Sequence, residues 1–198
     1  MRDAKHVSPT DEQTSDAEIA AATIGELKPH PASIQLADYD SAWPTLFQRE
    51  AQRIREALGG SVLQLEHVGS TSVPGLAAKP LIDIVLVVED SSNEPAYLPA
   101  LEQRGYFLRV REPDWYQHRV LKGPDTDVNL HVFSTGCVEI DRMLAFRDCL
   151  RDHVDDRLLY EQTKRELASR TWRSVQDYAD AKTSVIREIL DRASRLAR

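Results

Sequence analysis

A turn rich in glycine and hydroxyl groups stands shortly before an aspartate that interrupts an apolar stretch. The turn is Gly69-Ser70-Thr71, and the aspartate is Asp83 within the segment LIDIVLVV. Glycine lets a ligand approach the backbone, and the exposed N–H and hydroxyl groups of such a turn donate to phosphate oxygens. A buried carboxylate must be paired, hydrogen-bonded or bound to a cation. Together these groups are typical of phosphoryl and nucleotidyl transfer, in which donors face a metal-binding acid.

Each half of this pattern also has a simpler interpretation. The turn does not have the spacing of a Walker loop or of a dinucleotide-binding loop, and taken alone it indicates a solvated turn. Asp83 taken alone could be a structural residue that binds a loop backbone. Because Lys79 stands in the loop that leads to Asp83, we expect it to reach a phosphate bound at the same place.

Cations on apolar helical stripes give an independent indication of an anionic ligand. Each of three expected C-terminal helices carries one, and these are Arg147, Lys164 and Lys182. A single case is usually a side chain whose charge reaches solvent at the edge of the stripe. Ion pairs with Asp83 or Glu66 would also account for one or two of them. Three cases in three helices nevertheless favour a shared anion.

The segment YQHRVL offers two further donors on neighbouring positions. Successive side chains of a strand point to opposite faces, so at most one of His118 and Arg119 serves the site. We expect it to be Arg119. Trp115 and Tyr116 could stack on a nucleotide base, although Trp115 beside Pro113 is equally typical of a residue that anchors a turn.

The segment DVNLHVF carries Asp127, Asn129 and His131 on one face. Asp127 is the expected partner of Asp83 as catalytic acid and metal ligand, and Asn129 or His131 could replace it. A histidine on a half-apolar strand is more often structural than a ligand, which applies to His67 as well. The histidine spacing is not that of a zinc site.

These groups must be positioned by helices and strands, and the order of the expected helices and strands predicts an α+β domain. An N-terminal helix precedes a mixed sheet of about five strands, and a C-terminal helical layer follows. Periodicity and turn residues place helices at 40–58, 95–104, 138–152, 156–169 and 172–194, and strands at 61–68, 81–88, 106–110, 116–121 and 127–133.

The amino-acid composition predicts one globular domain preceded by a polar tail. The 198 residues are 41% hydrophobic and carry a formal net charge of −7, so we expect no nucleic-acid partner. No apolar run approaches the roughly 18 residues of a membrane helix, and because residues 1–16 contain no hydrophobic core segment we expect no secretory signal. We therefore expect a cytoplasmic protein in which Cys137 and Cys149 are free thiols. Residues 1–32 read as a mobile tail that includes a short helix at 17–27, and residues 33–198 as the domain.

Several segments resemble the GrpB family, and together they reach from Ile34 to about Ala193. They are HVGSTSVPGLAAKPLIDI, YDSAWPTLF, NLHVF and YADAKTSVI. The resemblance implies the fold of the nucleotidyltransferase superfamily, and with it Mg²⁺ and a nucleoside triphosphate as cofactors. It also implies a link to dephospho-CoA kinase, to which such a domain is joined in some proteins. The chain departs from the superfamily pattern at Val85, where a second acid usually shares the metal with the first.

Three hypotheses about function follow. The first is a nucleotide-dependent transferase that moves a nucleotidyl or adenylyl group to a small acceptor, such as a carboxylate. The second is a module that binds a nucleotide, coenzyme A or a phosphorylated metabolite without chemistry, which Val85 favours. The third is an interaction protein that works through its acidic tail. The sequence leaves the acceptor, the base and the oligomeric state open.

Overall fold

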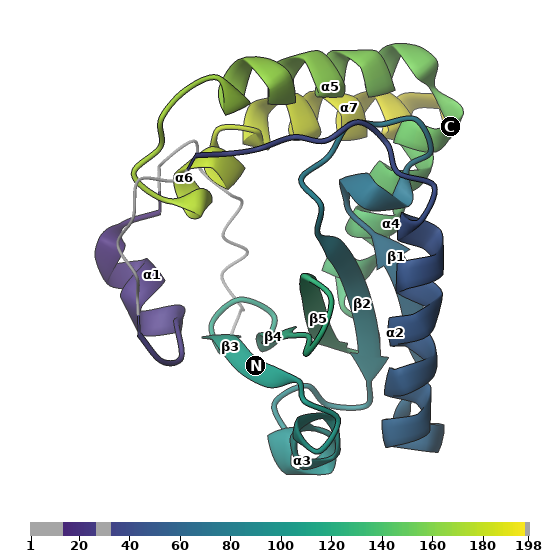
Figure 1. Ribbon diagram of the computed structural model, residues 1–198, viewed down its shortest axis with the longest axis vertical. Coiled ribbons are helices and arrows are strands. Elements are labelled where there is room, and N and C mark those ends of the chain that lie inside the picture. Colours follow the sequence, from purple (N-terminus) through teal and green to yellow (C-terminus); the bar gives the residue numbers. More distant parts are fainter. Residues whose placement is uncertain (1–13, 27–32, 197–198) are drawn as a thin grey trace.

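A five-stranded mixed sheet forms the centre of the computed structural model, which describes residues 14–26 and 33–196 (Figure 1). The strand order is β1-β2-β5-β4-β3, with β2 parallel to β5 and the other neighbours antiparallel. This architecture confirms the predicted α+β class and sheet. The strands are β1 (Gln64–Val68), β2 (Ile82–Val88), β3 (Phe107–Glu112), β4 (His118–Lys122) and β5 (Val128–Ser134).

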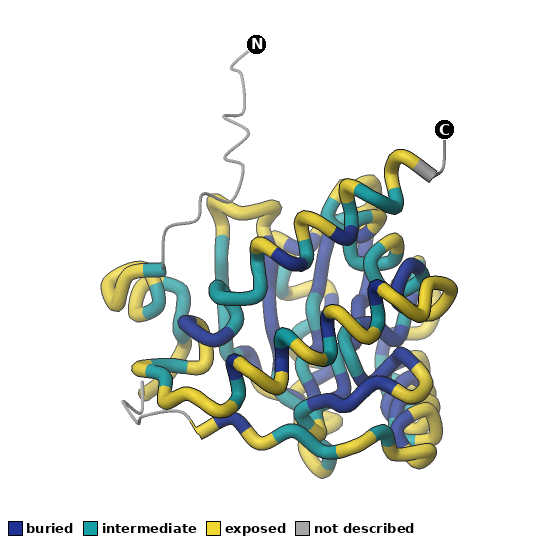
Figure 2. The backbone as a smooth tube through the Cα atoms, turned by 90° about the horizontal axis from the view of Figure 1, so that it is seen from above, coloured by how far each residue is buried: buried dark blue, intermediate teal, exposed yellow. Residues whose placement is uncertain are grey.

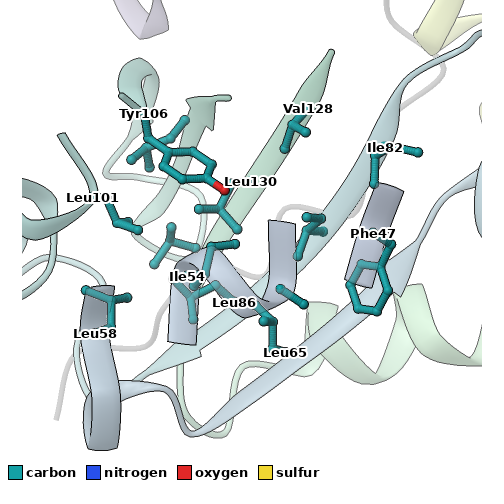
Figure 3. Close-up of a cluster of buried hydrophobic side chains, with 14 of the residues drawn as sticks. Phe47, Ile54, Leu58, Leu65, Ile82, Leu86, Leu101, Tyr106, Val128 and Leu130 are labelled. Atoms are coloured by element: carbon teal, nitrogen blue, oxygen red, sulfur yellow. The ribbon is translucent and has the colours of Figure 1, made fainter. Parts of the chain in front are cut away.

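One face of the sheet is covered by α2 (Trp43–Leu58) and α3 (Leu98–Glu102). Side chains of α2 point toward alternate residues of β2 and β5, and the cluster is closed by Tyr106 (Figure 3). Fully burying one such aliphatic side chain contributes about 1.5–3 kcal/mol. The helix predicted at 40–58 is confirmed, although it begins at Trp43; it ends at Leu58 and is followed by the cap residue Gly59, whose φ of +54° favours glycine.

The other face carries α4 (Val138–Asp152), which packs on Val85 and Phe133. Helices α5 (Val154–Ala168) and α7 (Thr183–Leu196) run side by side across one end of the sheet (Figure 1). Together with α4 they enclose a second apolar cluster that includes the loop after β1. These helices therefore cover the end of the sheet at which β1 ends and β2 begins.

The helix predicted at 172–194 is in fact two helices, α6 (Val175–Asp180) and α7. No proline or glycine marks the break. Tyr178 packs in a cluster with Ile34, whereas the buried residues of α7 pack against α4, and one straight helix does not serve both clusters. The break places Lys182 at the junction between the two helices.

The N-terminal segment contains helix α1 (Asp16–Ala22), close to the short helix predicted at 17–27. The described part of the predicted tail touches the domain: Thr23 forms a β-bridge with Val110, and Asp16 pairs with Arg173 of the α5–α6 loop. Residues 1–13 and 27–32 lie outside the described residues, and the boundary at residue 32 stays a prediction.

Burial follows this arrangement. The strands are largely buried, and the outer turns of the helices are exposed (Figure 2). Cys137 and Cys149 are free thiols, as predicted. Within the part of the chain that the structure describes, no helix is long and apolar enough to cross a membrane.

Candidate functional site

The turn after β1 folds directly onto the aspartate of β2. Gly69 has a φ of +68°, and a Cβ atom built on it would lie 2.4 Å from Oδ2 of Asp83. Only glycine permits both this backbone conformation and this close approach. From the α4 side, the guanidinium of Arg151 donates to the carbonyl of Ser72 at 2.7 Å and ties the turn to the helical layer.

His67 supports the turn from the opposite face of the sheet. Its ring stacks on Phe47, and its Nε2 lies 3.1 Å from Oγ1 of Thr71, which in turn donates to the carbonyl of Leu81. Burial lowers the pKa of His67 to about 4, so the ring is neutral at pH 7 and donates through Nε2. His67 is thus a structural residue that orients Thr71, as the sequence favoured.

Asp83 is held by two neighbours on β5. Asn129, its partner in the register, donates to Oδ1 at 2.9 Å, and Nε2 of His131 lies 3.5 Å from the same oxygen. Burial opposes ionisation, but His131, Asn129 and the charge of Lys182 outweigh it and hold the pKa of Asp83 below its ordinary value. Asp83 is therefore an anion at neutral pH.

Lys164 of α5 inserts its ammonium between the turn and the loop that follows it. The side chain is almost fully buried, with 2% of the residue exposed. Its Nζ donates to Oγ of Ser70 at 3.1 Å and to the carbonyl of Ala77, and it lies 4.9 Å from the centroid of the Tyr160 ring. Burial, reinforced by the charge of Lys182, lowers the pKa of Lys164 to about 7.

Lys182 approaches the same place from the junction between α6 and α7. Its ammonium lies 4.5 Å from the centroid of the Tyr178 ring, a cation–π contact. Burial lowers its pKa, and the charges of Tyr178 and Asp83 oppose that shift. Across residues 14–26 and 33–196, no carboxylate lies within 4 Å of the ammonium of Lys164 or Lys182.

These groups line one pocket with a volume of about 250 Å³. The pocket lies between the beginning of β2 and the helices α5 and α6. The lining includes most of the residues predicted from the sequence. It is made by Leu36, Ser70, Thr71, Lys79, Leu81, Asp83, Asn129, Lys164, Val175, Tyr178, Ala179 and Lys182.

Arg119, which the sequence analysis favoured over His118, does not line this pocket. The register pairs Arg119 with Val132, on the sheet face covered by α2 and α3, where its Nε binds Glu94 at 2.6 Å. His118 lies on the face of Asp83, because its neighbour Arg119 points the other way. Its Nε2 lies 3.0 Å from Nδ1 of His131.

Two other predicted residues have partners elsewhere. Arg147 binds Glu66 at 2.8 Å, the ion pair considered as an alternative, and it also contacts Asp148. Asp127 precedes β5, has 57% of its side chain exposed and pairs with Lys122 at 3.4 Å. Neither of these residues lines the pocket.

The residues around Asp83 do not fit a magnesium site of the two-metal kind. Val85 occupies the second acid position and is fully buried, and Asp127 lies outside the pocket. Two N-bearing side chains surround Oδ1 of Asp83, and the nearby ammonium of Lys182 repels a divalent cation. Within the described residues, no group of three His, Cys, Asp or Glu side chains could hold a metal ion.

The sequence analysis did not single out the tyrosines that contact the two lysines, of which Tyr178 lines the pocket. Tyr160 and Tyr178 lie under the two ammonium groups, and a buried aromatic at helical spacing before a lysine is the only sequence signal that could have indicated them. Leu36 also lines the pocket and carries no chemical signal in the sequence.

Comparison with known proteins gives a consistent set of relatives. The family model described as "GrpB protein" matches residues 33–192. The "UPF0157 protein BH1888" of Halalkalibacterium halodurans is 60% identical over 194 residues, which cover 98% of this chain and 97% of that protein. A solved structure, "Crystal structure of conserved protein GrpB from Enterococcus faecalis", superposes with a TM-score of 0.69 at 29% identity and covers 82% of this chain and 99% of that one. A "Dephospho-CoA kinase" of Mycolicibacterium paratuberculosis is 28% identical, and the match covers 82% of this chain but 46% of that protein.

Proposed function

The chain belongs to the GrpB family, and from this premise we propose that its pocket binds the phosphate end of a nucleotide or of a related phosphorylated small molecule. One observation carries the proposal: Lys164 and Lys182 both approach the pocket, and neither has a carboxylate within 4 Å among the described residues. Keeping cations out of water without an anion is unfavourable, so a ligand anion is the natural compensation.

The remaining lining suits a phosphate. Lys79 adds a third ammonium, and Ser70 and Thr71 offer hydroxyl groups on the glycine turn. The volume of about 250 Å³ lies below the range of roughly 300–1,000 Å³ that encloses a drug-sized ligand. The pocket therefore holds the phosphate end, while the rest of the ligand extends outside it.

The second candidate is nucleotidyl transfer, which the ionised Asp83 at the pocket wall favours. Asp83 would accept a hydrogen bond from an acceptor hydroxyl, and the lysines would stabilise the charge that develops on the phosphate. The relative named dephospho-CoA kinase makes adenine nucleotides and coenzyme A derivatives sensible ligands to test. The single acid beside Val85 favours binding over rapid turnover.

A thermal-shift and calorimetric screen tests the binding proposal. The ligands are pyrophosphate, AMP, ADP, ATP, dephospho-CoA and coenzyme A, each with and without Mg²⁺. We expect at least one to raise the melting temperature without Mg²⁺, and Lys164→Met or Lys182→Met to weaken its binding tenfold or more, which is about 1.4 kcal/mol. Arg104→Met removes an exposed charge on the far side of the molecule and should leave binding unchanged.

The outcomes separate the two candidates. Release of pyrophosphate from ATP with an added acceptor would establish transfer, and binding without release would establish the module. The binding proposal is overturned if no ligand in the screen shifts the melting curve at millimolar concentration.

A further inference from the structure

The turn after β1 carries three hydroxyl groups, and two of them donate to the protein backbone. Oγ1 of Thr71 donates to the carbonyl of Leu81 at 2.9 Å, and Oγ of Ser72 donates to the carbonyl of Gly69 at 2.6 Å. Both of these residues are buried, whereas Ser70 is half-buried and lines the pocket. Ser70 is therefore the hydroxyl of this turn that is best placed to react with a bound ligand.

The described partners of the Ser70 hydroxyl are two side chains of α5. Nζ of Lys164 lies 3.1 Å from Oγ of Ser70, and the hydroxyl of Tyr160 forms a hydrogen bond with Ser70. Tyr160 and Lys164 stand at positions i and i+4, so they share one face of the helix. A serine hydroxyl within hydrogen-bond reach of a buried lysine is the arrangement of a Ser–Lys catalytic dyad, in which the neutral amine takes the proton of the hydroxyl.

The loop after the turn fixes the position of the lysine. Nζ of Lys164 also donates to the carbonyl of Ala77, and Glu161, which precedes Lys164 on α5, accepts from the backbone N–H of Ala77 at 3.3 Å. A neutral amine has one lone pair. With one of its hydrogens on the carbonyl of Ala77, this lone pair can accept the hydroxyl hydrogen of Ser70. The base is thus oriented by a third group, as in other pairs of nucleophile and base.

We propose that Ser70 is a nucleophile that takes a phosphoryl group from the ligand, with Lys164 as its general base. This reaction rests on the proposed function, because the pocket must first bind the phosphate end of the ligand. Oγ of Ser70 forms a bond to the terminal phosphorus, and the bond between phosphorus and the bridging oxygen of the ligand breaks. The proton of Ser70 passes to Lys164 and then to the leaving oxygen. The products are a phosphoserine at position 70 and the ligand without its terminal phosphoryl group.

The electrostatic surroundings of Lys164 suit a base. Burial, reinforced by the charge of Lys182, lowers the pKa of Lys164 to about 7, so the neutral amine is present at neutral pH. Once it has taken the proton, its ammonium stabilises the charge that develops on the phosphoryl group. The other titratable groups that contact Lys164, influence its charge or line the same pocket are Tyr160, Glu161, Arg165, Tyr178, Lys79 and Asp83.

Reaction of the full-length, ligand-free protein with a fluorophosphonate is the direct test. Such a probe gives its phosphorus to an activated serine and releases fluoride, so the natural ligand need not be known. Peptide mass spectrometry should find the label on Ser70, and Ser70→Ala should lose it. Lys164→Met should slow the labelling roughly a hundredfold or more. The control Ser169→Ala removes a hydroxyl that donates to a backbone carbonyl at the end of α5, and it should change nothing.

The pH profile of the labelling rate separates a base from a structural lysine. In the wild type the rate should rise with pH and reach half of its plateau near pH 7, where Lys164 loses its proton. This measurement needs no variant, so it decides the question even if Lys164→Met does not fold. Absence of the label from Ser70, or a labelling rate that stays constant as the pH passes through 7, would overturn the inference.

The ligand screen of the proposed function has a separate outcome. Binding of pyrophosphate or ATP without any labelling of Ser70 would overturn the phosphoryl transfer and leave the proposed function standing. Labelling of Ser70 with the expected pH profile, but without a shift of the melting curve by any ligand, would confirm the activated serine and overturn the proposed function.

Discussion

Two clusters of cations, one on the sheet face covered by α2 and α3 and one in the pocket at the beginning of β2, are compensated in different ways. On the face of α2 and α3, the carboxylate of Glu94 binds Arg111 and Arg119 at 2.6 Å each. The hydrogen bond from Arg111, together with Arg119, lowers the pKa of Glu94 to about 2. In the pocket, Lys164 and Lys182 have only hydroxyl, carbonyl and aromatic partners among the described contacts.

The difference separates cations that hold the fold together from cations that we propose bind a ligand. The arginines have an internal anion, so nothing further needs to bind them. The lysines contact neutral groups, and burial lowers the pKa of both, which is the response of a buried cation that has no carboxylate within 4 Å among the described residues. Sequence periodicity alone does not distinguish the two kinds, because both place a basic residue beside apolar ones.

The largest expected effect is on the arginine cluster. Glu94→Gln leaves Arg119, whose side chain is 5% exposed, without its carboxylate. Breaking such a buried pair costs about 3–5 kcal/mol of the free energy of unfolding, measured by urea denaturation. Ligand binding in the pocket should be unchanged for the folded fraction. If Glu94→Gln lowers the free energy of unfolding by less than about 1 kcal/mol, the arginines do not depend on this carboxylate, and the proposed difference between the two clusters is wrong.

A smaller effect is expected when the glycine that faces Asp83 gains a methyl group. Gly69→Ala combines a φ of +68° with a Cβ atom 2.4 Å from Oδ2, and we expect a loss of roughly 2–4 kcal/mol together with weaker ligand binding. The matched control is Gly75→Ala. Its φ of +77° is equally unfavourable, but nothing lies within 4 Å of its Cβ, so it should cost only about 1 kcal/mol and spare binding. Equal losses in the two variants would show that Asp83 is not packed against the turn.

The next largest effect is expected on the pH dependence of the free energy of unfolding, which should differ between the two clusters. The unfolded chain keeps the proton of Lys164 up to pH 10.5, but the native state begins to lose it at about pH 7. Between these values the unfolded state binds more protons, so the free energy of unfolding rises with pH, by roughly 2 kcal/mol from pH 7 to 9. The rise should vanish in Lys164→Met. The pair at Glu94 has the same sign in another window: its contribution is present above pH 4.5 and is lost as the pH falls toward 2.

The smallest effect is expected at the surface. Asp38→Asn breaks the pair between Asp38, with 90% of its side chain exposed, and Arg165. Such a pair contributes about 0–1 kcal/mol and is screened by salt. Chemical denaturation at low and high ionic strength should show that the free energy of unfolding of Asp38→Asn differs from that of the wild type by no more than this amount. A larger loss would contradict the expectation that exposed ion pairs contribute less than buried ones.

Much of the site was predictable because it depends on local chemistry. The glycine turn, Asp83 and the strand that carries Asn129 are adjacent in sequence or paired in the sheet, so strand alternation places them together. Lys79 lies in the connection between them. Lys164 and Lys182 both line the pocket, and the signal that singled them out was the position of each on an apolar helical stripe. Arg147 also falls on an apolar stripe, but in the structure it forms an ion pair with Glu66. The position of a cation on a stripe does not predict whether a carboxylate of another element lies opposite it.

The amino-acid sequence by itself determined the α+β order of elements, the family and the glycine turn that faces one acid. These follow from periodicity, from the steric freedom of glycine and from a long specific segment. The tertiary structure decided that Arg119 faces away from the pocket, that the last predicted helix breaks before Lys182, and that His118 of β4 lies against His131 of β5. Each of these depends on strand register or on the packing of distant elements, because side chains remote in sequence meet only when the sheet and its helices are assembled.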